Sequence, residues 1–495
     1  MKKLICLLMA AILVLSFSAC NNDVLEDDLT SDNSLSINAN NSSSNTQTSS
    51  NTQTPSNTQT PSNTQTPSNT QTPSNTQTPS NTQTPSNTQT PSNTQTPGNT
   101  QTPSNTQTPE STPSDDSNAT TKVSVWNGTS ATIWSSGNGT AGNPYVIESA
   151  ANLAYLAQKS NSGYTFNNEY FILATNIDLN NHAWLPIGRK ASPFCGNFNG
   201  DGYQISNVNL SKSHISVSNG LKYERRGLFG HTLNCTISNL YVSGVSANIH
   251  STATDSDIYY VGAIVGYAQA DYKSVIENCY IQNVSLQYNT SVDNVIHMGG
   301  IVGSVDLAQN ANMSFSHVSA DVKMNIASSA GNRLGGIVGC INLKGIADFT
   351  NICSYLQMTQ TSKGVYNASS LIGAIITENG SLNLSSCYLS LKTNKSEFNA
   401  TSSSGYKNRT KGCLGEVYGQ FKGKSKFTNV FATVSVFNSD YSSQLELYPY
   451  ALEYHDALTV NNCKVVSVLP NTCGFSKSAW DLSNMSHPKL KDIIG

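Results

Sequence analysis

The sequence predicts an all-β fold, a parallel β-helix built from coils of roughly 35 residues. Two repeated patterns support this prediction: a short apolar block between glycines, and a run in which apolar and polar residues alternate. A segment near the start of this region has helical spacing instead and predicts a short N-terminal capping helix. All three features lie in one predicted domain, residues 120–495.

The glycine-bracketed block returns at nearly constant spacing. Its successive closing glycines lie 36, 37, 36 and 34 residues apart. We expect these glycines at corners of the coil, where φ is unusual or where neighbouring backbones approach closely. The copies are Gly227-Leu228-Phe229-Gly230, Gly262-Ala263-Ile264-Val265-Gly266, Gly300-Ile301-Val302-Gly303, Gly336-Ile337-Val338-Gly339 and the weaker Leu371-Ile372-Gly373-Ala374.

The alternating run follows each block, and alternation is a strand signal. An Asn recurs at one fixed place in it, and stacked Asn side chains form hydrogen bonds from coil to coil in other stacked β structures. An apolar residue follows that place. Three cysteines hold this position, so we interpret them as small buried hydrophobes. The Asn residues are 207, 239, 278, 351, 429 and 462, and the cysteines are Cys279, Cys387 and Cys463.

Other repeat folds of similar period fit the chain less well. Ankyrin and tetratricopeptide repeats need amphipathic helices, whereas the repeats here alternate as strands do. A β-propeller blade needs four strands in about 40–45 residues. One unit of this chain buries too little surface to fold alone, and stacked units share a continuous core.

The ends of a solenoid need covers. Residues 149–161 predict the N-terminal capping helix, because Ser149 is a favourable N-cap and Leu153, Leu156 and Ala157 form one apolar face. At the other end, we expect the segment from Trp480 onward to cover the last coil, together with the Tyr-rich loop 441–455.

Residues 1–19 have the features of a secretory signal peptide. Lys2 and Lys3 precede an apolar run, Leu4 to Leu15, that is shorter than the about 20 residues of a transmembrane helix. The run ends in Phe17-Ser18-Ala19-Cys20, which resembles the bacterial lipobox. We therefore expect lipidation of Cys20 and attachment to a membrane, with plain secretion as the alternative.

Residues 20–119 predict a disordered anchor segment and stalk. Residues 33–109 carry no charge, and Ser-Asn-Thr-Gln-Thr-Pro repeats with a period of six. Such a segment has no apolar face to bury, so it cannot form a core. It is interpreted as a spacer that lifts the domain away from the membrane; the alternative is an expanded repeat of no selected length.

Charge and cysteine spacing exclude several classes of function. Beyond residue 116 the chain carries 25 basic and 22 acidic residues without a basic stripe, which argues against nucleic-acid binding. The nine cysteines from Cys195 to Cys473 show no CxxC spacing, which opposes a zinc site. We expect no metal and no cofactor.

Several segments together resemble a known family. They are Gly142-Asn143-Pro144-Tyr145, Trp184-Leu185-Pro186-Ile187-Gly188, Pro193-Phe194-Cys195-Gly196 and Gly227-Leu228-Phe229-Gly230. Their order resembles that of the GLUG-motif surface proteins, bacterial β-helix proteins of adhesin-like and cell-wall-associated contexts, over about residues 140–490. The resemblance implies a right-handed β-helix, no single activity and no catalytic residues.

The residues favour binding over catalysis. A polysaccharide-cleaving β-helix needs acids clustered across adjacent coils, and the acids here are scattered, so we predict no enzyme. The candidate ligand contacts are exposed aromatics, Tyr259, Tyr260, Tyr267 and Tyr272, and the insertions Ser211–Arg226, Ala247–Tyr260 and Glu397–Lys411.

Taken together, these features predict a monomeric lipoprotein on the extracellular face of the cell envelope. It would present its β-helix for adhesion to, or binding of, glycans or host and surface proteins. A polysaccharide lyase or hydrolase is the first alternative, and a passive envelope scaffold is the second.

Overall fold

The computed structural model describes residues 28–30 and most of 122–490. The gaps are 252–256, 292–293, 329–331, 362–365, 378, 395–396, 402–406, 410–412, 420–423, 437–457, 467–468, 470–472, 474, 476, 479 and 485–488. Cys20, the predicted signal peptide, the proline repeats and the loop 441–455 lie outside the described residues. Three residues of the predicted 20–119 segment, Asp28–Thr30, form strand β1.

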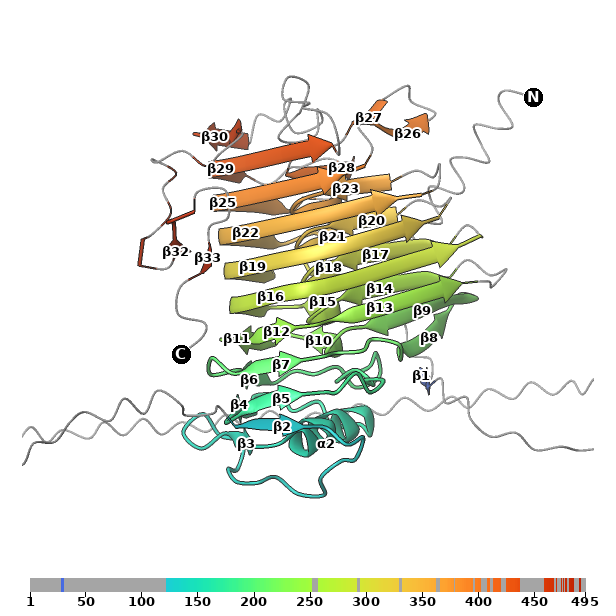
Figure 1. Ribbon diagram of the computed structural model, residues 1–495, viewed down its shortest axis with the longest axis vertical. Helices are drawn as coiled ribbons and strands as arrows, with labels where there is room; N and C mark the ends of the chain where they lie inside the picture. Colours follow the sequence, from blue (N-terminus) through green and yellow to red (C-terminus); the bar gives the residue numbers. More distant parts are fainter. Residues whose placement is uncertain are drawn as a thin grey trace, which may run out of the picture. The chain divides into compact units, whose positions relative to one another are not determined.

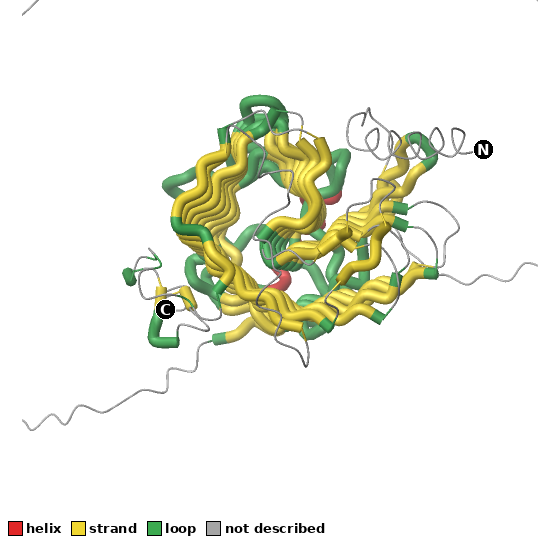
Figure 2. Tube along the Cα trace, turned by 90° about the horizontal axis from the view of Figure 1, so that it is seen from above, coloured by secondary structure: helices red, strands yellow, loops and turns green. Residues whose placement is uncertain are grey.

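The described chain is a stack of coils whose strands form three sheets, and it confirms the predicted parallel β-helix (Figure 1). Each regular coil contributes one strand to every sheet, as β14, β15 and β16 do before β17, β18 and β19. Viewed from above, the strands of successive coils superimpose (Figure 2).

The three sheets differ in length and regularity. The seven-stranded sheet runs β1, β8 (His214–Ser218), β9 (Leu221–Arg226), β14 (Ile258–Gly262), β17 (Val295–Gly299), β20 (Asn332–Gly335) and β23 (Tyr366–Ser369). The six-stranded sheet runs β10 (Phe229–Leu233), β15 (Val265–Ala270), β18 (Val302–Leu307), β21 (Val338–Leu343), β24 (Ile372–Thr377) and β28 (Leu414–Gly419).

The sixteen-stranded sheet contains the longest strands. Its main path is β2 (Val123–Val125), β5 (Asn176–Asp178), β7 (Gln204–Ser206), β12 (Tyr241–Ser243), β16 (Lys273–Thr290), β19 (Asn312–Ala327), β22 (Ile346–Gln360), β25 (Ser381–Thr393), β29 (Ser425–Val436) and β30 (Leu458–Asn461). Beside this path lie β3 (Tyr145–Ile147), β4 (Tyr170–Leu173), β6 (Asn197–Asn199), β11 (Thr236–Ser238), β13 (Ser246–Ser251) and β31 (Lys464–Val465). Two short hairpins, β26 (Glu397–Thr401) with β27 (Lys407–Arg409) and β32 (Trp480–Asp481) with β33 (Lys489–Leu490), complete the described strands.

In-register stacking builds the core. Val265, Val302, Val338 and Ile372 lie one above another on consecutive coils, and all four are buried. Cys279 and Cys387 occupy the predicted core row, while Cys463 is half-buried at its end. Burial raises the pKa of the Cys279 and Cys387 thiols to about 12. The described cysteines are all free, so these thiols act as apolar filling.

The recurring Asn marks a bend in the long strands. Asn239, Asn278 and Asn351 have φ of 51°, 50° and 54°, a left-handed conformation that Asn tolerates better than most residues. The predicted ladder is present in part: Asn278 Nδ2 donates to Asn239 Oδ1 at 3.0 Å, and Asn239 Nδ2 donates to Asn199 Oδ1 at 2.9 Å. The prediction is wrong for Asn207, which follows the pair Ser206–Ser243 at a different bend and donates to Asp178 Oδ1 at 2.8 Å. The sequence predicted the hydrogen bonds but not the positive φ that selects Asn.

The corner glycines are needed for close approach rather than for an unusual φ. At Gly300, an added Cβ would meet the carbonyl oxygen of Gly336 on the next coil and, at 2.7 Å, Cγ2 of Val322. Two backbones therefore pass each other at this corner with no room for a side chain.

The two ends of the stack are finished differently. Helix α2 (Ala150–Asn161) begins at the predicted N-cap, where Ser149 Oγ accepts from the Asn152 amide at 3.2 Å, and it buries Leu153 and Leu156.

No helix in the described part of the chain is long and apolar enough to cross a membrane.

The prediction that the segment from Trp480 covers the last coil is wrong for its described residues. Trp480 is buried against the outer face of the long sheet, in a cluster with Cys353, Tyr388 and Phe431. Those three residues stack in register and form an apolar outward row. Such a row needs cover, and the C-terminal segment supplies it.

Candidate functional site

The four tyrosines predicted as exposed do not form one surface. Tyr272 is 79% exposed, at the turn between β15 and β16, and Tyr267 is half-buried. The prediction is wrong for Tyr259 and Tyr260, each of which is 4% exposed. Tyr259 points into the core, where its ring lies 5.7 Å from that of Tyr288. Tyr260 lies on the opposite face of β14, which is also covered.

That covered face belongs to a polar layer between the seven- and six-stranded sheets, which we call the corner seam. Two rows of residues, each in register from coil to coil, face each other across it. They are Arg225, Tyr260, His297 and Arg333 on one sheet, and His231, Tyr267, Ser304 and Cys340 on the other.

Contacts across the seam are close. The rings of Tyr260 and Tyr267 lie 5.0 Å apart, and the guanidinium of Arg225 lies within 5.8 Å of both ring centres. Arg225 is 1% exposed and donates to Ser216 Oγ at 2.7 Å. The seam is therefore a packed layer that joins two sheets, and its tyrosines are structural.

The protonation of His297 follows from its partners. Arg333 Nη1 lies 2.6 Å from His297 Nε2, and an arginine can only donate, so Nε2 accepts and the proton sits on Nδ1, 3.2 Å from Ser304 Oγ. Burial and the Arg333 charge lower the pKa of His297 well below its ordinary value. Burial and Arg225 do the same for the pKa of His231.

Two of the described acids, Asp306 and Asp348, tie coils together. Asp348 accepts from Asn312 and Asn383, each at 2.8 Å, and Asp306 accepts from Tyr267 and Asn342 at 3.1 and 2.8 Å. Among the residues described, no three of His, Cys, Asp and Glu lie close enough to hold a metal ion. These carboxylates serve as hydrogen-bond acceptors within the fold.

The insertion Ser211–Arg226, predicted as a ligand-facing loop, is an antiparallel hairpin of β8 and β9 that extends the seven-stranded sheet. His214 and Arg225 from it are buried. The insertion therefore completes the fold rather than forming a free loop, although Lys212 just before β8 reaches the surface.

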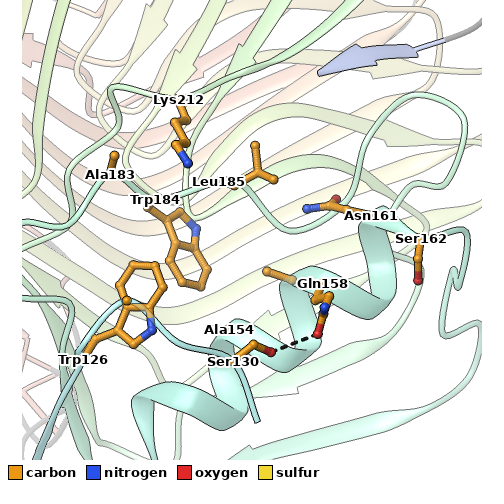
Figure 3. Close-up of a pocket in the computed structure, with 12 residues that line it drawn as sticks. Trp126, Ser130, Ala154, Gln158, Asn161, Ser162, Ala183, Trp184, Leu185 and Lys212 are labelled. Atoms are coloured by element: carbon orange, nitrogen blue, oxygen red, sulfur yellow. Dashed lines mark hydrogen bonds between the residues drawn. The ribbon is translucent and has the colours of Figure 1, made fainter. Parts of the chain in front are cut away.

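A cleft of about 400 Å³ lies beside the capping helix (Figure 3). Helix α2 contributes one wall, and the segments around Trp126 and Trp184 contribute the opposite side, which we call the floor. It is lined by Trp126, Gly128, Ser130, Ala154, Ala157, Gln158, Asn161, Ser162, Ala183, Trp184, Leu185 and Lys212. Of the segments predicted from the sequence to contact a ligand, Ser211–Arg226 reaches the cleft through Lys212, whereas Trp126, Trp184 and the α2 residues were not predicted as a site.

The two tryptophans form a fixed floor. Their rings meet edge to face with centroids 5.4 Å apart. Trp126 Nε1 donates to the Thr129 carbonyl at 2.7 Å, and Trp184 Nε1 donates to the Leu228 carbonyl at 3.0 Å. Because both indole N–H groups are engaged, the floor offers apolar contact rather than hydrogen bonds.

Polar groups form the rim. Gln158 Oε1 accepts from Ser130 Oγ at 3.0 Å, and Asn161 Nδ2 donates to the Pro186 carbonyl at 2.9 Å. Asn161 Oδ1 is buried and has no hydrogen-bond partner in the described part of the chain. Lys212 is exposed and is the one charged side chain among the lining residues. The cleft thus offers an apolar floor, amide groups and a cation.

Parts of this chain are similar in sequence to two proteins whose names indicate a surface or membrane association. No protein-family model matches it. The chain is 30% identical over 213 residues to halomucin of Haloquadratum walsbyi, and this match covers 41% of the chain and 2% of halomucin. It is 27% identical over 158 residues to a protein of Evansella cellulosilytica, provisionally named a Gly-rich membrane protein, covering 31% of this chain and 16% of that protein. The chain therefore spans only a small part of either relative.

Among solved structures, the chain is similar to a Bacteroides ovatus protein provisionally described as an immunoglobulin A1 protease. The identity is 16% and the TM-score is 0.44, and the match covers 72% of this chain and 95% of that one.

Proposed function

We propose that this protein is a lipid-anchored surface protein that binds extracellular glycans or proteins and does not catalyse a reaction. Two relatives that match part of the chain carry the names of a mucin and a membrane protein, which supports an association with the surface or membrane. The signal-like residues 1–19 and the lipobox-like sequence before Cys20 support lipid attachment.

The cleft beside α2 is the observation that carries the binding role. It is preformed, since both indoles are fixed by hydrogen bonds to the backbone. Its volume of about 400 Å³ is within the range of small-molecule sites. None of its lining residues is Asp or Glu, so it provides contacts for a ligand without a pair of carboxylates for acid–base catalysis.

A glycan and protein array tests this proposal. The probe is the full chain carrying Cys20→Ala, so that lipid does not cause adhesion. We expect binding to a restricted set of ligands, lost in Gln158→Ala/Lys212→Ala and retained in Lys273→Ala, an exposed lysine of β16. Silence across the array, or equal binding by all variants, would count against the cleft as the binding site.

A further inference from the structure

We infer that the cleft takes the carboxylate-bearing end of an acidic glycan, such as a terminal uronic acid. This inference rests on the proposed binding function and names the class of its ligand. It follows from the charge, the hydrogen-bonding groups and the size of the cleft.

The charge of the cleft is one-sided. Lys212 is the single cation among the twelve lining residues, and none of them is acidic. Figure 3 shows the Lys212 side chain reaching down towards Trp184. A ligand carboxylate at this place would meet the ammonium of Lys212, and because Lys212 is exposed, the attraction between the two charges is screened by salt.

The helical wall supplies the contacts that a sugar ring requires. Gln158 and Asn161 lie three residues apart on α2 and therefore on the same face of the helix. Gln158 uses Oε1 to accept from Ser130, which orients its NH₂ group as a donor. Asn161 uses Nδ2 to donate to the Pro186 carbonyl, and its Oδ1 is shielded from solvent. The Gln158 NH₂ group is therefore the amide donor available to a sugar hydroxyl.

The apolar floor and the small volume of the cleft favour the end of a sugar chain over a long stretch of polymer as the ligand. Ala183 and Leu185 are half-buried and present carbon atoms that suit the C–H face of a pyranose, while the Gln158 amide suits its hydroxyls. Trp184 is 1% exposed and supports this surface from beneath. A cleft of about 400 Å³ is at the small end for ligand pockets. It therefore fits one or two sugar units at a chain end.

Calorimetry and NMR titration with three probes test the inference: a glucuronic acid-terminated oligosaccharide, its glucose-terminated counterpart, and an acidic peptide of equal charge. The protein is the full chain with Cys20→Ala. We expect the acidic sugar to bind up to about five-fold more tightly than the other two, which is what an ion pair with an exposed lysine supplies. Lys212→Gln should remove that advantage and leave the neutral sugar unchanged, and Gln158→Ala should weaken both sugars. Lys273→Gln is the matched control.

Each outcome separates the ligand class from the wider proposal. Equal affinity for both sugars, or an acidic-sugar affinity that Lys212→Gln does not change, overturns the inference but leaves glycan binding standing. Tighter binding of the peptide overturns the sugar assignment. A chain that ignores all three probes and is silent on the array contradicts the proposed function itself.

Discussion

The left-handed bend at Asn278 gives a sharp test of how the coils are held. Asn278→Ala removes the ladder bond to Asn239, worth about 1 kcal/mol, and replaces Asn by a residue that tolerates a φ of 50° less well, which costs about 1–2 kcal/mol. The expected loss is about 2–3 kcal/mol. Asn278→Gly loses the same bond but adopts this φ freely, and its extra chain entropy costs about 0.5–1 kcal/mol. Glycine should therefore be less damaging than alanine by up to about 1.5 kcal/mol.

Equilibrium urea unfolding, followed by far-ultraviolet circular dichroism, measures this difference. Ser285, an outward residue of β16 with an ordinary φ, is the matched control, and there alanine should be the better replacement. If alanine is also better at Asn278, the bend does not select Asn. If Asn278→Gly costs nothing, the ladder bond contributes no stability.

Further predictions follow from single residues of the chain. Gly300→Ala should destabilise by about 1–3 kcal/mol in the same unfolding assay, because its Cβ would meet backbone of the next coil. The lowered pKa values of His231 and His297 keep both neutral when folded, so stability should be complete above about pH 6.5 and fall as pH decreases below it; unfolding at pH 7.5 and pH 5 measures this. Cys387→Val should change stability by less than about 1.5 kcal/mol, whereas Cys387→Ser should cost about 2 kcal/mol through a buried hydroxyl. Cys20→Ala should abolish labelling of the protein by a lipid precursor in cells.

The regular coils could be predicted because each of their constraints recurs. A corner too tight for Cβ and a bend at positive φ act on every coil, so glycine and Asn return at fixed spacing. The path of the C-terminal segment was not predicted, because the apolar outward row that it packs against takes one residue from each of three successive repeats. Cys353, Tyr388 and Phe431 each follow a core residue by one position, and their apolar character stands out only when the repeats are aligned.

The candidate site was harder to predict than the fold. Tyr259 and Tyr260 were both predicted to be exposed, although neighbouring residues of a strand point to opposite faces and at least one of the two therefore faces the core. Both are buried because the seam covers the second face of β14. The cleft leaves no periodic pattern in the sequence, because Trp126, Gln158 and Lys212 belong to three separate segments that come together only in the folded N-terminal end. The scarcity of tryptophan, four in the chain, was the one available hint.

The position of the cleft determines how a substitution in it would affect the stability of the fold. A residue inside the regular coils has an in-register neighbour above and below, so a substitution there disturbs the stack on both sides. Gln158 and Lys212 are exposed and lie on α2 and in the segment before β8, outside the stacked strands. Substitutions at such exposed positions usually change stability by no more than about 0.5 kcal/mol. Under the proposed function, substitutions at these positions would therefore change the ligand while the solenoid stays intact. For the same reason, a lost affinity in these variants would report on binding rather than on folding.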